Sequence, residues 1–344
     1  MDEEELVLLG IRFRGNRTVE FVELPKPVAK GTNVVVEVKA SALCGTDLPY
    51  YFAPTDELGY VPGHEIAGCV AEVDKASSFV KVGDRVILNT QVGCGHCDEC
   101  RRGRVLFCSE MKTAGVFGLD GGHSDYILIP EKDCLPLPEG IPYDVASVIP
   151  DGLGVPYHST QKLSVASLDT VVVFGLGPIG LGMVLYLKFL GSQVIAIEPN
   201  EYRRKLAKEL GADFVIDPES TDVLRSILEI TSGIGVDKAI DCSSSPITVG
   251  LALASVRKGG RVGLVGQKES QVTIQNYTRT IIHRELEVFS SCGYNLGEYG
   301  TLMRLVQRGL RVSKLITHRF PFREAPEAYK VFSEGNTGKV VLVH

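Results

Sequence analysis

Hydrophobic and polar positions along the chain change their rhythm near residue 170. Before residue 150, short β-branched runs alternate with polar turns, which is typical of a mostly β domain. The strands predicted there are residues 34–38, 66–73, 85–88 and 126–129. From Thr170 onward, apolar strands alternate with helical stretches, a pattern that favours a parallel, doubly wound sheet. The strands predicted there are residues 171–174, 193–197, 214–216, 237–240 and 261–265.

Helical and turn signals complete this outline. An apolar helix ending at Leu190 is followed by Gly191, and a charged amphipathic helix covers about residues 200–210. One more helical stretch at 299–308 leads to a last strand at 339–343. We therefore expect an α/β protein with a β-rich domain in residues 1–154 and a doubly wound domain in 155–293. The segment 294–344 is expected to return to the first domain.

The amino-acid composition limits the classes of function that this protein can have. Hydrophobic residues make up 44% of the 344 residues and charged residues 23%, which is typical of a globular protein of about two domains. The formal net charge of −6 offers no basic surface for nucleic acid. The N-terminus is acidic, unlike a secretory signal, and the uncharged run 171–187 is short and broken by glycine and proline. We expect a cytoplasmic protein with no membrane or nucleic-acid partner.

A glycine-rich turn predicts a dinucleotide site. Residues 175–180 form the pattern GxGxxG between a buried strand and a helix, where glycines allow pyrophosphate to approach the backbone. Glu198, at the end of the next strand, favours NAD over NADP, while Arg203 nearby weakens that preference because it could pair with a 2′-phosphate. The alternative is a turn that merely packs. The predicted cofactor-binding residues are Gly175, Gly177, Pro178, Ile179, Gly180, Glu198, Arg203, Val265 and Gly266.

Four of the nine cysteines crowd into one loop. They follow the pattern C-x2-C-x2-C-x7-C, which lets a short loop wrap four thiolates around one ion with no position left open. This spacing predicts a structural zinc site in residues 90–112; an iron–sulfur cluster and paired disulfides are the alternatives. His96 is surplus to four thiolates and is expected to face solvent. The predicted ligands are Cys94, Cys97, Cys100 and Cys108.

Further motifs give the chain a family resemblance. Residues 42–47 (ALCGTD) and 62–65 (PGHE) precede the cysteine loop and the GxGxxG turn, and residues 337–341 (TGKVV) follow them. In this order and over nearly the whole chain, they resemble the zinc-dependent medium-chain alcohol and polyol dehydrogenases. The resemblance implies a GroES-like β-barrel catalytic domain joined to a Rossmann domain, with the active site in the cleft between them.

The resemblance also assigns site residues. Cys44 and His64 look like ligands of a catalytic zinc, and Asp151 occupies the position of the third ligand. Glu65 is an adjacent acid that can approach or briefly ligate the metal. Thr46 matches the hydroxyl residue that bonds the reacting oxygen and passes its proton onward, and Asp47 is placed to orient His64. Taken singly, these residues would be read as a core cysteine, a turn histidine and a helix cap. Two zinc ions per chain, one catalytic and one structural, follow from this assignment.

One position departs from the family pattern. Many relatives carry a histidine five residues after the first cysteine ligand, and Pro49 stands there and cannot carry a proton. Proton release must then use water, the cofactor ribose or another group, and Pro49 also argues against a threonine dehydrogenase. Tyr50, Tyr51 and Phe52 are candidates for an aromatic substrate wall or for ordinary core or surface positions. His123 is a weaker substrate-site candidate, and the histidines expected to be structural are His158, His283 and His318.

The function predicted from the sequence is hydride transfer between NAD and an alcohol. A secondary alcohol, polyol or cyclic alcohol is favoured as substrate, because residues 44–47 resemble the polyol branch. An aldose dehydrogenase of the same family, a zinc-free double-bond reductase and a non-catalytic NAD-binding protein are the alternatives. Because relatives are usually dimers or tetramers, we expect a homodimer or a homotetramer.

Overall fold

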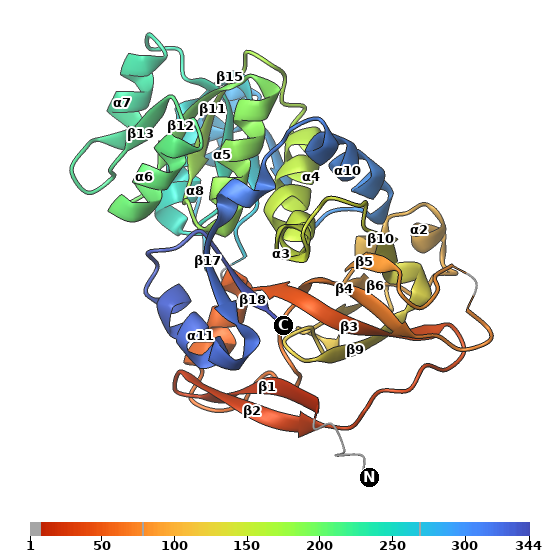
Figure 1. The fold of residues 1–344 in the computed structure, drawn as a ribbon. Helices are drawn as coiled ribbons and strands as arrows, with labels where there is room; N and C mark the ends of the chain where they lie inside the picture. The colour runs from red at the N-terminus through yellow and green to blue at the C-terminus, as the bar shows by residue number, and fades with distance from the viewer. Residues whose placement is uncertain (1–7, 78, 268–269) are drawn as a thin grey trace, which may run out of the picture.

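The computed structural model describes residues 8–77, 79–267 and 270–344, which form two sheet-centred halves (Figure 1). In the half that holds most of the first 150 residues, the main sheet has seven strands, in the order β10-β5-β4-β3-β18-β17 with β9 also paired to β3. Its strands are β3 (Asn33–Ala42), β4 (Glu65–Glu72), β5 (Arg85–Leu88), β9 (Tyr126–Pro130), β10 (Cys134–Pro136), β17 (Ile316–Pro321) and β18 (Lys339–Val343). All of its pairings are antiparallel except β17 with β18.

Smaller elements extend this half. A hairpin of β1 (Leu8–Gly15) and β2 (Thr18–Leu24) forms a sheet of its own, and a third sheet joins β6 (Gln91–Val92), β7 (Lys112–Ala114) and β8 (Gly118–Leu119). The helices here are α1 (Leu48–Phe52), α2 (Asp98–Arg101), α3 (Tyr143–Val148) and α11 (Ala325–Ser333). The four predicted strands are confirmed as β3, β4, β5 and β9.

The second half is a six-stranded, fully parallel sheet in the order β13-β12-β11-β14-β15-β16. This is the strand order of a dinucleotide-binding doubly wound sheet. The strands are β11 (Thr170–Phe174), β12 (Gln193–Ile197), β13 (Phe214–Ile216), β14 (Val236–Asp241), β15 (Val256–Leu264) and β16 (Glu287–Ser290). The helices are α4 (Gly154–Lys162), α5 (Pro178–Leu190), α6 (Glu201–Glu209), α7 (Val223–Ile230), α8 (Pro246–Ser255), α9 (Tyr277–Thr280) and α10 (Tyr299–Gln307).

Alternation along β11 explains why this sheet is covered on both faces. Val171 and Val173 pack into the same core as α4 and α5, whereas Val172 and Phe174 pack with α7 and α8. Successive side chains of a strand point to opposite faces, so an uninterrupted apolar run is what a doubly covered strand requires. Gly191 ends α5 in a left-handed conformation with φ of 94°, as predicted.

The last part of the chain crosses back to the first sheet. α10 packs against the second half through Leu302, while β17 and β18 join the seven-stranded sheet beside β3 (Figure 1). The exact domain boundaries, at residues 154 and 293, stay a prediction. Within the described parts of the chain, no helix is long and apolar enough to cross a lipid bilayer.

Candidate active site

Four predicted site residues meet where β3, β4 and a short helical turn converge. Cys44 follows the end of β3, and His64 comes just before β4, whose first residue is Glu65. The antiparallel register pairs Ala42 with Glu65, which brings the two motifs side by side. Asp151 comes from a π-helical turn, Ile149–Leu153, between α3 and α4. One ligand-type atom from each of Cys44, His64, Glu65 and Asp151 lies within 4.8 Å of those of the others.

Asp47 connects two members of this cluster. Its Oδ2 accepts a hydrogen bond from the Cys44 backbone N–H at 2.9 Å, and its Oδ1 lies 3.7 Å from His64 Nδ1. The carboxyl group is only 3% exposed, and burial raises its pKa. Because Nδ1 faces Asp47, the other ring nitrogen of His64 remains for a metal; the positioning role of Asp47 stays a prediction.

Lys339 is a site residue that the sequence motifs did not predict. Its side chain is fully buried, and its ammonium group contacts Glu65 Oε1 and lies 3.0 Å from Asp151 Oδ2. Burial acts to raise the pKa of Asp151, but the charges of Lys339 and His64 and the hydrogen bonds with Glu65 and Lys339 together outweigh it and lower that pKa to about 2. The residue lies inside the TGKVV motif used for the family resemblance. The available signal in the sequence was a lysine at the start of an apolar run. A lysine in that place indicates a buried ammonium group that carboxylates stabilise.

The donor set fits a catalytic zinc. Zinc in such sites is held by thiolate, imidazole and carboxylate with one position left open, and Cys44, His64 and Asp151 supply one of each. The Cys44 Sγ lies 3.4 Å from Asp151 Oδ2, so one ion could reach both. Burial and the neighbouring carboxylate raise the pKa of the Cys44 thiol to about 12. A bound divalent cation would oppose that effect and stabilise the thiolate.

A cleft of about 370 Å³ opens from this cluster toward the parallel sheet. Cys44, Thr46, His64 and Asp151 form one wall, and Gly177–Gly180 with Val265 and Gly266 form the other. The hydroxyl oxygen of Thr46 is buried and has no hydrogen-bond partner among the described residues, so it is free for a ligand in the cleft. The lining residues that were not predicted are Gly45, Gln91, Met111, Thr113, Val116, Val155, Cys242, Ser243, Gln267, Cys292 and Gly293.

The glycine turn has the backbone that a dinucleotide site requires. Gly175 has φ of +81°, and a Cβ built on Gly180 would lie 1.9 Å from the Gly175 carbonyl oxygen. A Cβ built on Gly177 would meet no atom within 4 Å, so the backbone there is open to the cleft. Glu198 is nearly buried and accepts hydrogen bonds from the backbone N–H groups of Leu176 and Asn200.

Arg203 lies close to Glu198 but does not form an ion pair with it. Burial lowers the pKa of the Arg203 guanidinium, while the charge of Glu198 acts in the opposite direction. The Arg203 Nε is buried with no partner among the described residues. Neither Glu198 nor Arg203 belongs to the described lining of the cleft, so their roles at the adenosine end of a cofactor stay predictions.

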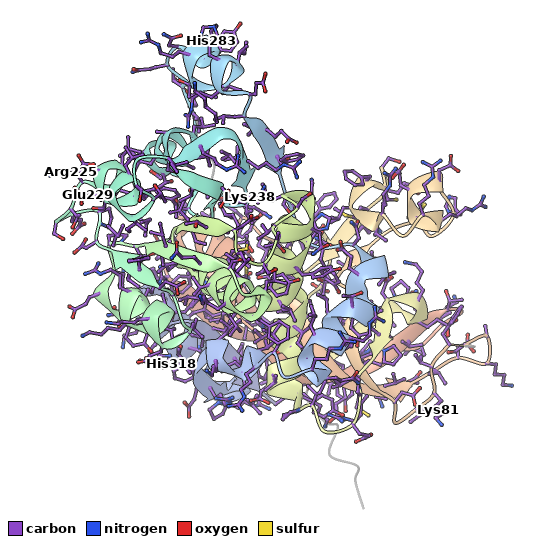
Figure 2. The ribbon with its side chains drawn as sticks, turned by 90° about the horizontal axis from the view of Figure 1, so that it is seen from above. Lys81, Arg225, Glu229, Lys238, His283 and His318 are labelled. Atoms are coloured by element: carbon purple, nitrogen blue, oxygen red, sulfur yellow. The ribbon has the colours of Figure 1, made fainter. Side chains whose placement is uncertain are left out.

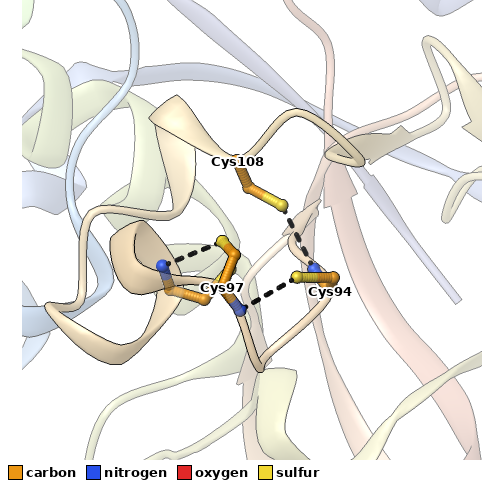
Figure 3. A group of neighbouring side chains, drawn as sticks. Cys94, Cys97 and Cys108 are labelled. Carbon is orange, nitrogen blue, oxygen red and sulfur yellow. Dashed lines mark hydrogen bonds between the residues drawn. The ribbon is translucent and has the colours of Figure 1, made fainter.

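The cysteine loop brings its four sulfurs together as predicted. The ligand atoms of Cys94, Cys97, Cys100 and Cys108 lie within 4.8 Å of one another, and all nine cysteines are unbridged. Figure 3 shows Cys94, Cys97 and Cys108 with the backbone hydrogen bonds to their sulfurs. Backbone N–H groups donate to the sulfurs of Cys108, Cys94 and Cys97 at 3.4 Å. The bond from Cys94 N–H lowers the pKa of the Cys108 thiol to about 7. Four gathered sulfurs in one short loop fit a closed metal site.

The aromatic residues after Pro49 do not line the cleft. Tyr51 is buried in the core beneath α11, and Phe52 is 43% exposed at the surface. Neither they nor Tyr50 belong to the described lining, which favours the interpretation as core or surface aromatics over an aromatic substrate wall. His123 is also buried away from the lining, where its Nδ1 bonds to Ser41 Oγ at 2.8 Å.

The remaining histidines lie outside the cleft. His158 Nδ1 lies 2.9 Å from Glu298 Oε1, which ties α4 to the start of α10. His283 lies exposed at the periphery of the molecule, and His318 bonds to its neighbour Thr317 (Figure 2). The side chain of His96 is 72% exposed. These placements agree with the structural or solvent-facing roles predicted for them.

Comparisons with known proteins match this geometry. A family described as the alcohol dehydrogenase GroES-like domain matches residues 30–139, and one described as zinc-binding dehydrogenase matches residues 178–308. The chain is also 35% identical to an L-threonine 3-dehydrogenase of Pyrococcus furiosus, over 94% of both chains. The chain belongs to the zinc-dependent medium-chain dehydrogenase family.

Solved structures of this family share the fold over nearly their whole length. One is described as a short chain alcohol dehydrogenase from E. coli CFT073 complexed with cofactor NADH. It is 29% identical to this chain, and the two structures match with a TM-score of 0.88 over 98% of this chain and 99% of that one. Another is 2R,3R-butanediol dehydrogenase from Bacillus subtilis, 25% identical, with a TM-score of 0.87 and the same coverage. The relatives establish the class: a nicotinamide-dependent oxidoreductase that acts on a CH–OH group.

Proposed function

We propose that this medium-chain dehydrogenase oxidises a secondary alcohol, polyol or cyclic alcohol with NAD, using one catalytic zinc. One observation carries the proposal: the cluster of Cys44, His64 and Asp151 opens into the same cleft as the glycine turn. Bound there, zinc would act as a Lewis acid that lowers the pKa of a substrate hydroxyl group. The nicotinamide cofactor would accept the hydride.

The chain's own residues would hold and orient the reactants. Cys44, His64 and Asp151 hold the metal, while Glu65 stays on the Lys339 side of the cluster. The buried Thr46 hydroxyl group could accept a hydrogen bond from the reacting hydroxyl group and take up its proton while releasing its own. Pro49 provides no onward relay, and the proton would leave through water or the cofactor ribose.

The proposal has three further parts: a second zinc, a preference for NAD and a homo-oligomeric state. The four gathered sulfurs of the cysteine loop support a structural zinc. Glu198 at the end of β12 supports NAD, because a carboxylate would repel a 2′-phosphate. The expectation of a homodimer or homotetramer rests on the family alone.

The substrate is tested with a panel. Formation of reduced cofactor is followed by absorbance with NAD and with NADP, against secondary alcohols, polyols, cyclic alcohols, aldoses and L-threonine. L-Threonine is included because relatives such as the Pyrococcus furiosus enzyme carry that name, although Pro49 argues against it. Turnover on a neutral alcohol with NAD is expected; turnover confined to L-threonine or to an aldose would replace the proposed substrate class.

The metal assignment is tested by Asp151→Ala. We expect at least a hundredfold loss in kcat/KM and loss of zinc from the Cys44 cluster, because one of three ligands is removed. Asp144→Ala is the matched control, since Asp144 lies on neighbouring α3 and its carboxylate pairs with Arg319, outside the Cys44 cluster. Undiminished turnover in Asp151→Ala would refute the zinc-dependent reaction.

A further inference from the structure

Helix α11 places a phenol group directly behind the proposed metal site. Tyr329 is completely buried, and its hydroxyl group donates a hydrogen bond to Asp47 Oδ2 at 3.3 Å. The two residues are separated by most of the chain, since Asp47 follows β3 and Tyr329 belongs to the segment that returns after β17. The contact therefore joins the end of the fold to the proposed ligand set.

Asp47 links Tyr329 to the proposed metal ligands. The oxygen that accepts from Tyr329 also accepts from the Cys44 backbone N–H at 2.9 Å. The other oxygen faces Nδ1 of His64 at 3.7 Å, and this buried nitrogen has no hydrogen-bond partner among the described residues. The rotation of the Asp47 carboxylate thus sets the backbone position of one proposed ligand and the ring orientation of another.

The ring of Tyr329 is held from three sides. Phe13 meets it edge-on with centroids 5.0 Å apart, Tyr51 stacks on it at 5.6 Å, and His123 meets it edge-on at 5.8 Å. These partners come from β1, α1 and the segment before β9, so the ring cannot move without disturbing three elements. The hydroxyl position is fixed by this packing and does not depend on the bond to Asp47.

We infer that Tyr329 is a positioning residue for the catalytic metal, holding Asp47 in the rotation that orients His64 and Cys44. The inference rests on the proposed function, because it needs a metal at the Cys44 cluster. Removing partners of this kind, which act behind metal ligands, typically costs 10–100-fold in metal affinity or activity.

Tyr329→Phe is the variant that tests this role. It keeps the ring and its three aromatic contacts and removes only the hydroxyl group. Tyr51→Phe is the matched control, because it removes a buried phenol hydroxyl from the ring stacked on Tyr329 without touching Asp47. Both variants are made in the full chain and compared with the wild-type protein by circular dichroism and thermal melting, to show that they fold alike.

The readout is zinc itself, measured by competition with a chromogenic chelator. In Tyr329→Phe we expect the zinc affinity of the Cys44 cluster to fall about 10–100-fold. The four-cysteine site serves as an internal control and should be unchanged. Cobalt(II) substituted at the Cys44 cluster should show a shifted visible spectrum, and kcat should fall more than KM rises. Tyr51→Phe should match the wild-type protein in each measurement.

The outcomes separate this inference from the proposed function. If wild-type protein binds zinc at the Cys44 cluster and Tyr329→Phe matches Tyr51→Phe in affinity, spectrum and turnover, Tyr329 is purely a packing residue and the inference is wrong. If the wild-type protein binds zinc only at the four-cysteine site, the proposed metal centre fails, and the inference fails with it.

Discussion

Replacing Lys339 with methionine should destabilise the metal-free catalytic half of the protein. Methionine keeps an unbranched side chain of similar length but removes the positive charge between Glu65 and Asp151. The Lys339 and Glu65 side chains are both 0% exposed, and that of Asp151 is 18% exposed, so water cannot replace the lost partner at Glu65. The perturbation leaves two neighbouring carboxyl groups without their shared cation.

The expected magnitude follows from this burial. Removing one partner of a buried ion pair costs about 3–5 kcal/mol, whereas an exposed pair is worth about 0–1 kcal/mol. Burial already raises the pKa of Glu65 well above its ordinary value, so in the variant this group can take up a proton and escape part of the penalty. We therefore expect the lower end, about 3 kcal/mol, which corresponds to roughly a hundredfold change in an equilibrium constant.

Hydrogen exchange of β3 and β4 in the chelator-treated protein measures this loss locally. Amide protection in these strands reports the opening of the seven-stranded sheet without requiring the two halves to unfold together. Exchange should be about a hundredfold faster in Lys339→Met. Lys330→Met is the matched control, because its ion pair with Glu327 is exposed, and exchange there should change by less than about fivefold.

A double variant isolates the electrostatic part. Glu65→Gln combined with Lys339→Met removes one carboxylate together with the cation, so it should be more stable than Lys339→Met alone by about 1–3 kcal/mol. Exchange in Lys339→Met as slow as in Lys330→Met would refute the reasoning. It would mean that the ammonium group contributes no net stabilisation to this cluster.

Two further variants probe the other sites. Cys97→Ser should lower the zinc content by one ion per chain, as measured by atomic emission, while Cys69→Ser outside the loop should leave it unchanged; equal zinc in both would contradict a four-cysteine site. Gly180→Ala should weaken NAD binding at least tenfold in calorimetry, because the added Cβ would lie 1.9 Å from a backbone oxygen of the glycine turn. Gly250→Ala on α8, whose Cβ meets nothing within 4 Å, is the control, and equal binding by both variants would argue against a dinucleotide at this turn.

Local patterns predicted most of the elements and the two ligand loops. The run 171–174 and the glycines after it were sufficient to predict a strand and a dinucleotide-binding turn. Periodicity, turn chemistry and phosphate geometry all act over short stretches of chain. The cysteine loop was predictable for the same reason, since all four sulfurs belong to one short segment. The Cys44 and His64 motifs needed the family resemblance, because nothing local to either of them shows that β3 and β4 pair.

The residues that were missed depend on contacts between distant segments. Lys339 meets Glu65 only because β18 adds to β3, and no periodicity in the sequence shows that pairing. Tyr329 resembles any apolar-face residue of an amphipathic helix until Asp47 is found beneath it. The cleft residues, such as Gln91 and Cys292, come from separate loops, so their convergence is a property of the fold rather than of any one motif.

The pairing of β3 with β18 also bears on when the protein can acquire its metal. Cys44 and His64 emerge from the ribosome early, but Lys339, which offsets the carboxylates beside them, and Tyr329 are made almost three hundred residues later. The four-cysteine loop has no such dependence, because its sulfurs are neighbours in the chain. During synthesis the loop can therefore load and close on its own ion first, whereas the Cys44 cluster becomes a finished site only after translation has delivered β18.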